Sequence, residues 1–443
     1  MTDCDLIVVG GGPAGLAHAF WRRRERPDLR VKVVEAADRV GGWLQTTSQD
    51  GFQLEHGPQG FRADDSTDAF LRAVGIDDEV VACAPSAQRR FVVRRGKLHE
   101  LPAKPGALLR SRLVSLPAKL RLMLEGRVRS TSDAGESVAA FVGRRFGSAA
   151  VPVAEAMMHG IFAGDAHQLE VAATLPLATE IEQRYGSMLR GMRARARERA
   201  AAGVATRPAV CTFEGGMHRS AQAVAELLGD AIHTDARVNS VVRTDAGYTA
   251  RCDGLELRAP ELCVTIPPGP AATLLRPLDR ALGDCLAEIP TVSAVSCYLG
   301  FEKAAVPEAV EGFGFLAPQG ELGSVLGSIY TSSVFPHQAP DGFELFRVMS
   351  GGHAYPHEID RPDDELLQQA SDILRELLGI YHPPTFRFVS RARAAIPQYV
   401  RGHTARMRAI SAKLAQHPGL SLMGSGYKKI SVVGQWANEG SRP

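Results

Sequence analysis

Three glycines near the start of the chain are spaced as in phosphate-binding turns. Gly10, Gly12 and Gly15 form the pattern G-x-G-x-x-G in the segment DLIVVGGGPAGLAHAF. Glycine lets the backbone turn sharply and approach a pyrophosphate, whose charge is stabilised by the positive end of the following helix. Glu35 comes about 20 residues after Gly15, where an acidic side chain accepts hydrogen bonds from a ribose. These residues predict a dinucleotide-binding site.

The hydrophobic pattern around the glycines predicts the elements that would position them. Residues 6–9 are a short apolar run of the kind that forms a buried strand, and a helical pattern begins at Ala14. A second apolar run over residues 31–34 ends next to Glu35. The first 35 residues are therefore expected to form a β-α-β unit.

Two further motifs favour FAD as the dinucleotide. The run EAADRVGG places Arg39, Gly41 and Gly42 shortly after the ribose-binding acid. The run GFQLEHGPQGF places Glu55, Gly57 and Pro58 on a loop that can pass beside a flavin ring. The alternative is that these are ordinary turn residues.

The composition is that of a folded chain with several packed units. Its 443 residues exceed a typical domain length of about 150. Lys and Arg total 51 against 49 Asp and Glu, so the chain as a whole lacks the basic field of nucleic-acid-binding proteins, and no nucleic-acid partner is expected. Seven cysteines show no C-x-x-C spacing, so no metal site is predicted and reduced cysteines in a cytoplasmic protein are expected. No apolar run of about 18 residues predicts a spanning helix, and the N-terminus lacks the features of a signal peptide.

The character of the sequence changes twice along the chain. Residues 101–200 lose strand character and become rich in Leu, Ala and Arg at helical spacing. Strand patterns return at Phe213, with turns predicted at residues 245–247 and 253–254, and continue to about residue 350. The fold class expected is α/β (α+β overall), with a Rossmann-like domain, a β-rich domain and a helical insertion.

Eight motifs in this order resemble oxygen-dependent protoporphyrinogen oxidases, the flavoenzymes of late haem synthesis. The motifs are VVGGGPAGLA, EAADRVGG, LEHGPQGF, GIFAGDAHQLEVAATLP, TFEGGM, GFGFLAP, RVMSGG and IPQYVRGH. The first two occur throughout amine-oxidase-like flavoproteins, whereas GIFAGD, GFGFLAP and IPQY point to this one family. The resemblance extends from about residue 5 to about residue 427.

The resemblance implies three domains. A discontinuous FAD-binding domain would comprise residues 1–83, 214–290 and 415–443. A substrate-binding domain would comprise residues 84–101, 198–213 and 291–414. A helical, membrane-docking domain would comprise residues 102–197.

The resemblance also implies site residues. Arg90 matches the family's propionate-binding arginine, with Arg89 as its rival and a solvated strand charge as the alternative. Four residues would surround the tetrapyrrole, although without the family each would be interpreted as a core residue; they are Gly314, Leu316, Ile329 and Met349. Three further residues would contact FAD: Val238 beside the adenine, and Gly424 and Tyr427 in the terminal turn. His56 and His159 are assigned no role, because a hydrogen-bonded structural histidine is the commoner outcome.

The implied reaction is the FAD-dependent oxidation of protoporphyrinogen IX to protoporphyrin IX, with molecular oxygen as acceptor and hydrogen peroxide as product. No catalytic side chain is predicted, because the flavin carries the chemistry. One alternative is the same reaction on coproporphyrinogen III, whose two additional propionates would need extra basic groups. The other is a flavin- or porphyrin-binding protein with little turnover.

The stretch 101–129 is basic enough to contact a lipid surface. Its charged residues are Lys104, Arg110, Arg112, Lys119, Arg121, Arg127 and Arg129, against only Glu125. An apolar stripe is expected on one helix face at Leu120, Met123, Leu124 and Arg127. Peripheral membrane contact by a cytoplasmic protein is therefore expected, with a helix packed on its own domain as the alternative. A homodimer is also compatible with the sequence.

The C-terminal residues depart from the family pattern after Tyr427. Lys429 and Ser431 occupy positions where the family has small residues, Gly434 and Gly440 are expected to break the following helix, and Pro443 ends the sequence. A helix N-terminus would offer free amides to the flavin pyrimidine. We therefore expect weakened flavin retention and low turnover.

Overall fold

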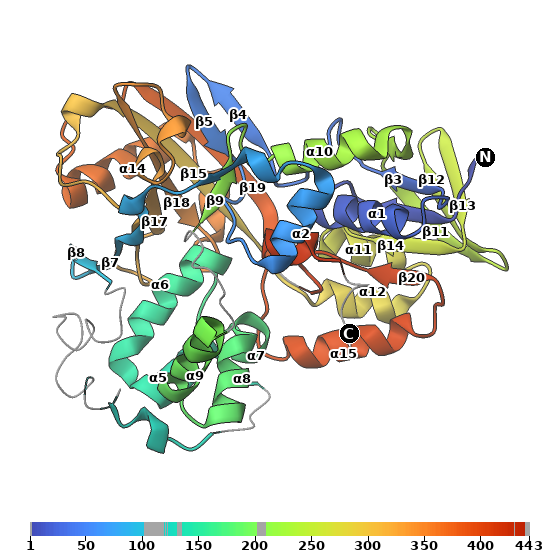
Figure 1. Ribbon diagram of the computed structural model, residues 1–443, viewed down its shortest axis with the longest axis horizontal. Helices are drawn as coiled ribbons and strands as arrows, with labels where there is room; N and C mark the ends of the chain where they lie inside the picture. Colours follow the sequence, from blue (N-terminus) through green and yellow to red (C-terminus); the bar gives the residue numbers. More distant parts are fainter. Residues whose placement is uncertain are drawn as a thin grey trace.

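The computed structural model describes residues 2–101, 119, 121, 123–130, 135–201, 210–428 and 430–438 (Figure 1). A five-stranded parallel sheet has the order β10-β3-β2-β14-β20. Its strands are β2 (Leu6–Val9), β3 (Val31–Val34), β10 (Ile232–His233), β14 (Glu261–Val264) and β20 (Leu420–Leu422). They come from three distant parts of the sequence. The predicted α/β class is confirmed, while the domain limits given above stay a prediction.

The predicted β-α-β unit is also confirmed. Helix α1 (Pro13–Glu25) begins one residue earlier than expected, because proline suits the first helical position. It buries Leu16, Ala17 and Phe20 against the parallel sheet. Gly12 is its N-cap, and no side chain there bonds the first-turn amides. The glycine turn therefore leaves the positive end of the helix open.

Two hairpins form a second sheet, of order β1-β13-β12-β11. Its strands are β1 (Thr2–Asp3), β11 (Val238–Thr244), β12 (Gly247–Cys252) and β13 (Leu255–Ala259). The turns between the last three strands lie where the sequence predicted them. Glycine is required at the first turn, since Gly247 has φ +125° and a Cβ there would lie 2.3 Å from the Ala259 carbonyl oxygen.

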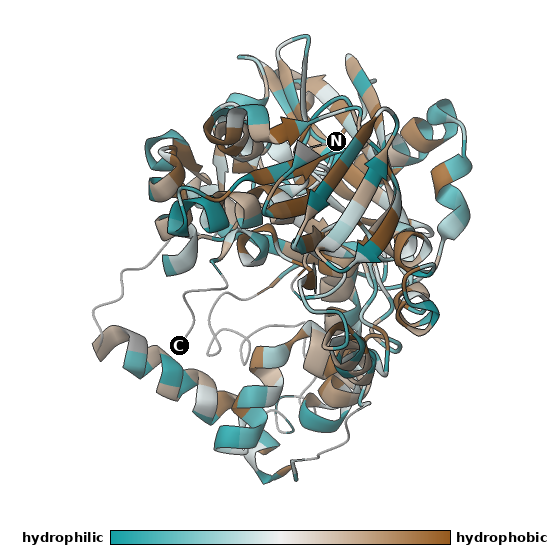
Figure 2. Cartoon of the chain, turned by 90° about the vertical axis from the view of Figure 1, so that its right-hand side faces the viewer, coloured by the Kyte–Doolittle hydropathy of each residue, from teal (hydrophilic) through white to brown (hydrophobic). Residues whose placement is uncertain are grey.

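A seven-stranded sheet forms the other half of the molecule, with the order β19-β15-β18-β17-β16-β7-β8. Its strands are β7 (Arg90–Arg94), β8 (Lys97–Glu100), β15 (Thr291–Glu302), β16 (Gly314–Leu316), β17 (Val325–Tyr330), β18 (Phe343–Gly351) and β19 (Phe386–Pro397). Alternate residues such as Val295, Cys297 and Leu299 pack against helix α14 (Asp363–Leu378). Because side chains alternate along a strand, the residues between them form the opposite face. Figure 2 is turned so that the N-terminal end of the molecule faces the viewer, and hydrophobic and hydrophilic residues are mixed along the strands in front.

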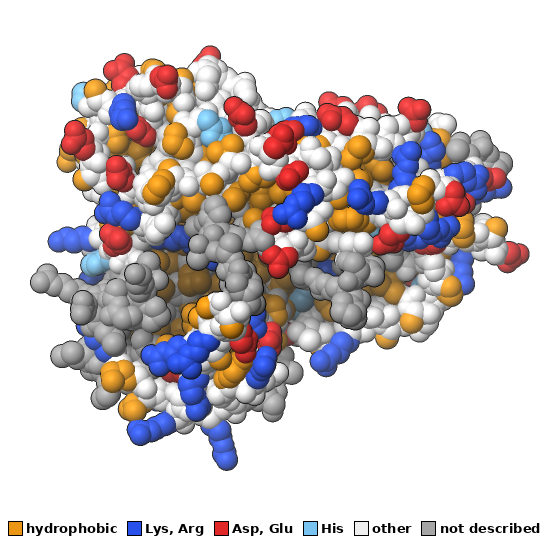
Figure 3. All heavy atoms as spheres, in the orientation of Figure 1, with side chains coloured by type: hydrophobic (Ala, Val, Ile, Leu, Met, Phe, Trp, Pro, Cys, Tyr) orange, Lys and Arg blue, Asp and Glu red, His pale blue; other side chains and the backbone are white. Residues whose placement is uncertain are grey.

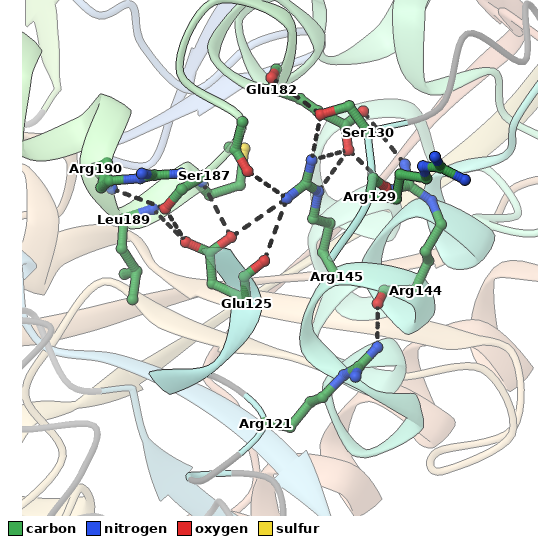
Figure 4. Close-up of polar contacts among 12 residues, drawn as sticks. Arg121, Glu125, Arg129, Ser130, Arg144, Arg145, Glu182, Ser187, Leu189 and Arg190 are labelled. Atoms are coloured by element: carbon green, nitrogen blue, oxygen red, sulfur yellow. Dashed lines mark hydrogen bonds and ion pairs between the residues drawn. The ribbon is translucent and has the colours of Figure 1, made fainter. Parts of the chain in front are cut away.

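A helical unit lies below the seven-stranded sheet in Figure 1. Its main helices are α5 (Val138–Phe146), α6 (Val151–Phe162), α8 (Pro176–Tyr185) and α9 (Met188–Ala201). The Arg145 guanidinium is fully buried between Glu182 and Glu125, at 3.5 Å from the Glu125 Oε2 (Figure 4). Arg144 pairs with Glu136 at 2.7 Å and with Glu182 at 2.8 Å. These ion pairs tie α5 to α8 and to the chain that precedes α5.

The stretch predicted to contact lipid is described only in part. Lys104, Arg110, Arg112 and Leu120 lie outside the described residues. The prediction that one helix face continues through Arg127 is wrong, because residues 125–127 form a 3₁₀ turn. Buried Glu125 accepts hydrogen bonds from the Met188 and Leu189 amides at the start of α9, which draws the chain inward. In the described part of the chain, no helix has the length and hydropathy needed to cross a bilayer.

Candidate active site

The glycine turn after β2 forms an open cradle at the start of α1. Gly10 has φ +108°, and a Cβ on Gly15 would lie 2.0 Å from the Gly10 carbonyl oxygen, so the helix packs directly on the turn. A Cβ on Gly12 would meet no atom within 4 Å. The space above Gly12 is therefore free for a ligand that binds the amides of the first helical turn.

Glu35 lies beside this cradle. Its carboxylate accepts hydrogen bonds from the Gly11 amide at 2.7 Å and the Ala37 amide at 2.9 Å. A carboxylate has about four lone-pair positions, so acceptor capacity remains for a ribose. The Ala236 amide bonds the Glu35 carbonyl oxygen at 2.8 Å, which places Val238, at the start of β11, close to the same edge.

The two predicted flavin loops contact each other. The Arg39 guanidinium donates to the Gly42 carbonyl oxygen at 3.0 Å and to the Gln45 side chain at 2.6 Å, so it braces its own loop. Gly41, with φ +102°, donates its amide to the Gly11 carbonyl oxygen and joins this loop to the cradle. A Cβ on Gly57 would lie 2.1 Å from the Trp43 carbonyl oxygen, so only glycine permits the approach. Half-buried Pro58 follows directly.

The turn after β20 completes the cradle. Gly424 has φ +113°, and a Cβ there would lie 3.7 Å from the Ala14 Cβ at the start of α1. The hydroxyl of buried Tyr427 donates to the Ile266 carbonyl oxygen at 2.9 Å, so this hydroxyl holds the main chain. The turns after β2, β14 and β20 meet at the carboxyl edge of the parallel sheet, where ligands of such sheets bind.

The C-terminal segment differs from the expectation. Gly434 does not break the helix: α16 (Val432–Trp436) includes it, and Ser431 caps α16 by accepting the Gly434 amide at 3.2 Å. Trp436 is buried, stacks on Phe70 at 5.2 Å and accepts the Trp21 indole N–H at its carbonyl oxygen. This burial holds the short helix in place. Lys429, Gly440 and Pro443 lie outside the described residues.

The predicted substrate residues lie on one face of the seven-stranded sheet. Gly314 on β16 pairs with Arg90 on β7 and with Ile329 on β17. In the next row on the same face, Leu316 and Met349 both lie opposite Gly327. Leu316, Ile329 and Met349 are half-buried, unlike the fully covered residues facing α14. They are therefore only partly covered by the rest of the described chain.

Arg90 lies at the edge of this face. Its guanidinium packs 4.8 Å from the centre of the Phe313 ring, and no carboxylate among the described residues pairs with it. Although the side chain as a whole is exposed, burial of the guanidinium and then the charge of Arg62 lower the pKa of Arg90. Arg89 is different, because it forms an ion pair with Glu100 at 3.3 Å. Arg90 is thus the better placed of the two to bind an anion.

Helix α6 forms a wall opposite part of this face. A Cβ on Gly160 would lie 3.0 Å from the Leu316 Cδ1, and the His159 ring contacts the Ala317 carbonyl oxygen at 2.7 Å. Met157 and Ile161 are four residues apart, so they are neighbours on the helix surface, and they are 44% and 47% exposed. Figure 3 shows hydrophobic side chains in the recess between the helical unit and the upper part of the molecule.

The sequence comparisons give the family. The profile of flavin-containing amine oxidoreductases matches residues 15–430. The chain belongs to this family. Protoporphyrinogen oxidase of Nicotiana tabacum is 30% identical over 427 residues, 91% of this chain and 77% of that protein. Coproporphyrinogen III oxidase of Propionibacterium freudenreichii is 32% identical over 97% of this chain and 88% of that protein.

A solved structure supports the same relationship. The crystal structure of a protein from Exiguobacterium sp., assigned as a protoporphyrinogen oxidase, superposes with a TM-score of 0.82 at 25% identity, and covers 98% of this chain and 97% of that one. The resemblance to protoporphyrinogen oxidases that the motifs indicated is confirmed. The relatives also include coproporphyrinogen III oxidases.

A flavin dinucleotide fits the residues of this flavin-containing amine oxidoreductase. The open space above Gly12 accepts a pyrophosphate, and the loops at Gly42 and Gly57 lie between the cradle and the seven-stranded sheet. Gly426 is buried, and its amide has no hydrogen-bond partner in the described part of the chain. Because buried amides are nearly always hydrogen-bonded, we expect the Gly426 N–H to donate to a bound ligand, and a flavin carbonyl oxygen is a suitable acceptor. The predicted cofactor is therefore FAD.

Two charged side chains are buried between the halves of the molecule. Glu55 was expected on a flavin loop, but its burial was not predicted, and Arg347 was missed. The Arg347 guanidinium donates to the Gly57 carbonyl oxygen at 2.8 Å and to Ser296 at 3.0 Å. Burial raises the pKa of Glu55 to about 7, although its carboxyl group accepts the Met217 amide at 2.9 Å. Both residues occur in motifs that carried the resemblance, RVMSGG and LEHGPQGF. The charge of Arg347 acts on Glu55 across nearly 300 positions of sequence, and such a distant interaction leaves no local signal.

His56 has a structural role at the same junction. Its ring bonds the Thr47 hydroxyl at 2.8 Å and the Ser390 hydroxyl at 2.8 Å. Burial lowers its pKa, which favours the neutral ring. The expectation of hydrogen-bonded structural histidines is therefore consistent with both His56 and His159.

Proposed function

We propose that this chain is an FAD-dependent oxidase that converts protoporphyrinogen IX to protoporphyrin IX. One observation carries the proposal: a half-exposed apolar strip, formed by Leu316, Ile329 and Met349, lies beside Arg90, which has no carboxylate partner among the described residues. A tetrapyrrole is complementary to this arrangement, because it is a flat apolar ring system with negatively charged propionates at one edge. The relatives named above support this substrate class.

The side chains in this proposal bind and orient the substrate. When bound, FAD accepts a hydride and a proton leaves in each of three two-electron oxidations, and three molecules of oxygen become three of hydrogen peroxide. The sheet face and α6 hold the macrocycle and exclude water, while the Arg90 guanidinium binds a propionate. Arg347 and Trp43 hold the Gly57 loop between the sheet and the cradle.

Steady-state turnover tests this proposal. The purified protein is given protoporphyrinogen IX in air, and porphyrin fluorescence and peroxide are measured together. We expect three peroxides per porphyrin formed, above the rate of spontaneous oxidation. A rate equal to that of buffer containing free FAD would refute the proposed activity.

Coproporphyrinogen III is the second candidate substrate, and Arg62 favours it. The positive charge of Arg62 lowers the pKa of Arg90, so Arg62 lies within electrostatic range of it, and neither guanidinium forms an ion pair with a carboxylate among the described residues. A substrate with two additional propionates would use the second cation. If coproporphyrinogen is the substrate, Arg62→Ala raises its Michaelis constant and leaves that of protoporphyrinogen unchanged. Equal Michaelis constants for coproporphyrinogen in Arg62→Ala and wild type would exclude this use of Arg62.

We also propose that the protein contacts membrane surfaces from the cytoplasmic side. The support is local: Met123 is 66% exposed and Leu124 is 37% exposed, between Arg121 and Arg127. Each Lys or Arg near an anionic membrane surface contributes about 1 kcal/mol to binding, and salt weakens this contribution by screening the charges. Arg121→Glu with Arg127→Glu is expected to reduce co-sedimentation with anionic vesicles, whereas Arg280→Glu, at a distant exposed site, is the control. Unchanged co-sedimentation of the double variant would argue for a segment packed only on its own domain.

A further inference from the structure

Tyr399 connects three parts of the chain at one point. It follows β19 in the motif IPQY and is only 3% exposed. Its ring packs edge-on against Phe162 at the end of α6, with centroids 5.3 Å apart, and stacks on His403 at 4.3 Å. Its hydroxyl donates a short hydrogen bond to the Ser425 carbonyl oxygen, in the turn that follows β20. Tyr399 thus links the wall of the substrate face to the turn of the cradle.

This hydrogen bond fixes the direction of the next amide. In a trans peptide, the carbonyl of one residue and the N–H of the next point in opposite directions. Holding the Ser425 carbonyl towards Tyr399 therefore turns the Gly426 N–H away from Tyr399. Gly426 is the buried residue whose amide has no partner in the described ranges. Side chains are also excluded there, since a Cβ would lie 2.5 Å from the Pro268 Cγ.

The turn is held from two sides. On the cradle side, the Tyr427 hydroxyl bonds the Ile266 carbonyl oxygen at 2.9 Å. On the other side, the Tyr399 hydroxyl bonds Ser425, and Ile430 packs against the core of the helical unit. Loss of the Tyr399 hydroxyl would leave the Ser425 carbonyl without this bond, so the peptide could rotate.

We propose that Tyr399 is a positioning residue for the flavin, because its hydroxyl holds the Ser425–Gly426 peptide so that the Gly426 amide is directed at the cofactor. The proposal rests on the flavin of the family and not on the identity of the substrate. The neighbouring Gln398 offers a comparison. It is equally buried, but its side-chain amide donates to the Phe162 carbonyl oxygen at 2.7 Å and not to the turn.

The test compares Tyr399→Phe with wild type. The ring and its contacts with Phe162 and His403 remain, and only the hydroxyl is lost. We expect the dissociation constant for FAD to rise by about 3- to 10-fold, as for one lost hydrogen bond. In the flavin-free protein, hydrogen exchange of the peptide containing residues 424–428 should become faster. Tyr381→Phe removes a hydroxyl from a side chain that is 79% exposed and should change neither quantity.

A second variant separates positioning from general stability. Gln398→Leu removes a buried hydrogen bond next to Tyr399 and is expected to lower the unfolding temperature without faster exchange at residues 424–428. If both variants accelerate exchange equally, or if Tyr399→Phe alters neither exchange nor the dissociation constant for FAD, Tyr399 is only a packing residue and the proposal is wrong. If the protein binds FAD as expected but oxidises no porphyrinogen, the proposed function fails while this inference stands.

Discussion

Arg90 offers the sharpest test of how this site holds its substrate. In Arg90→Ala the cation that borders the apolar strip is removed, while Leu316, Ile329 and Met349 are untouched. The structure predicts little loss of stability, because the guanidinium makes no ion pair with a described residue and its contact with Phe313 is worth about 0.5 to 1 kcal/mol. The effect should therefore fall on substrate binding.

The expected magnitude follows from the exposure of Arg90. A charged hydrogen bond to a carboxylate contributes about 1.5 to 3 kcal/mol. Because the side chain of Arg90 is exposed, water competes and the lower half of this range applies. A loss of about 1.5 to 2 kcal/mol corresponds to a Michaelis constant raised about 10- to 30-fold. Lysine keeps the charge but not the planar fork, so Arg90→Lys should lie between wild type and Arg90→Ala.

The assay measures kcat, KM and bound flavin for four proteins: wild type, Arg90→Ala, Arg90→Lys and Arg89→Ala. Arg89→Ala is the matched control, because that adjacent side chain is already paired with Glu100. We expect the flavin-to-protein ratio to be the same in all four. If Arg90→Ala and Arg89→Ala have the same KM, the propionate is bound elsewhere.

Three further predictions concern the cofactor, a buried acid and the helical unit. Glu35→Ala should weaken FAD binding by about 1 to 3 kcal/mol, measured by titrating the flavin-free protein with FAD. The control is Asp38→Ala, at an exposed position, which should not weaken binding. Equal affinities of the two variants for FAD would refute the ribose contact. Burial raises the pKa of Glu55 to about 7, so the folded protein holds that proton more tightly, and the free energy of unfolding should fall by about 3 kcal/mol as the pH rises from about 4.5 to 7. Glu55→Gln should flatten this profile in urea titrations at several pH values, and an unaltered slope would count against the assignment. Arg145→Ala leaves Glu125 without its buried counter-charge and should cost about 3 to 5 kcal/mol in the same titrations, whereas a cost below about 1 kcal/mol would show that the ion pairs of the helical unit are dispensable.

Local patterns predicted the parts of the fold that depend on neighbouring residues. The β-α-β unit and the hairpin turns at residues 245–247 and 253–254 follow from apolar runs and glycines that are close in sequence. The short C-terminal helix did not follow, because burial of Trp436 among residues more than 200 positions away outweighs the helix-breaking tendency of Gly434. The 3₁₀ turn at Glu125 also depends on a distant partner, the start of α9.

The same limit applies to the candidate site. The glycine fingerprint located the cradle, since spacing alone places Gly10, Gly12 and Gly15 on one turn. Arg347 was missed, because a single arginine within a strand carries no sign that it reaches the Gly57 loop. Tyr399 was part of a quoted motif, but its contact with Ser425 exists only after β19 and β20 have folded. The sequence indicated the chemistry of a residue where its partners are close in the chain. Contacts between segments that are distant in sequence were visible only in the structure.

The central claim is that a porphyrinogen bound on this sheet face reduces the bound flavin directly. Anaerobic titration of the purified, flavin-loaded protein with protoporphyrinogen IX, and separately with coproporphyrinogen III, tests it. Oxidation of a porphyrinogen to a porphyrin releases six electrons and each flavin accepts two, so one molecule of the true substrate should bleach three flavins. Visible flavin absorbance that stays unchanged with both porphyrinogens, while dithionite bleaches it fully, would contradict the proposed function.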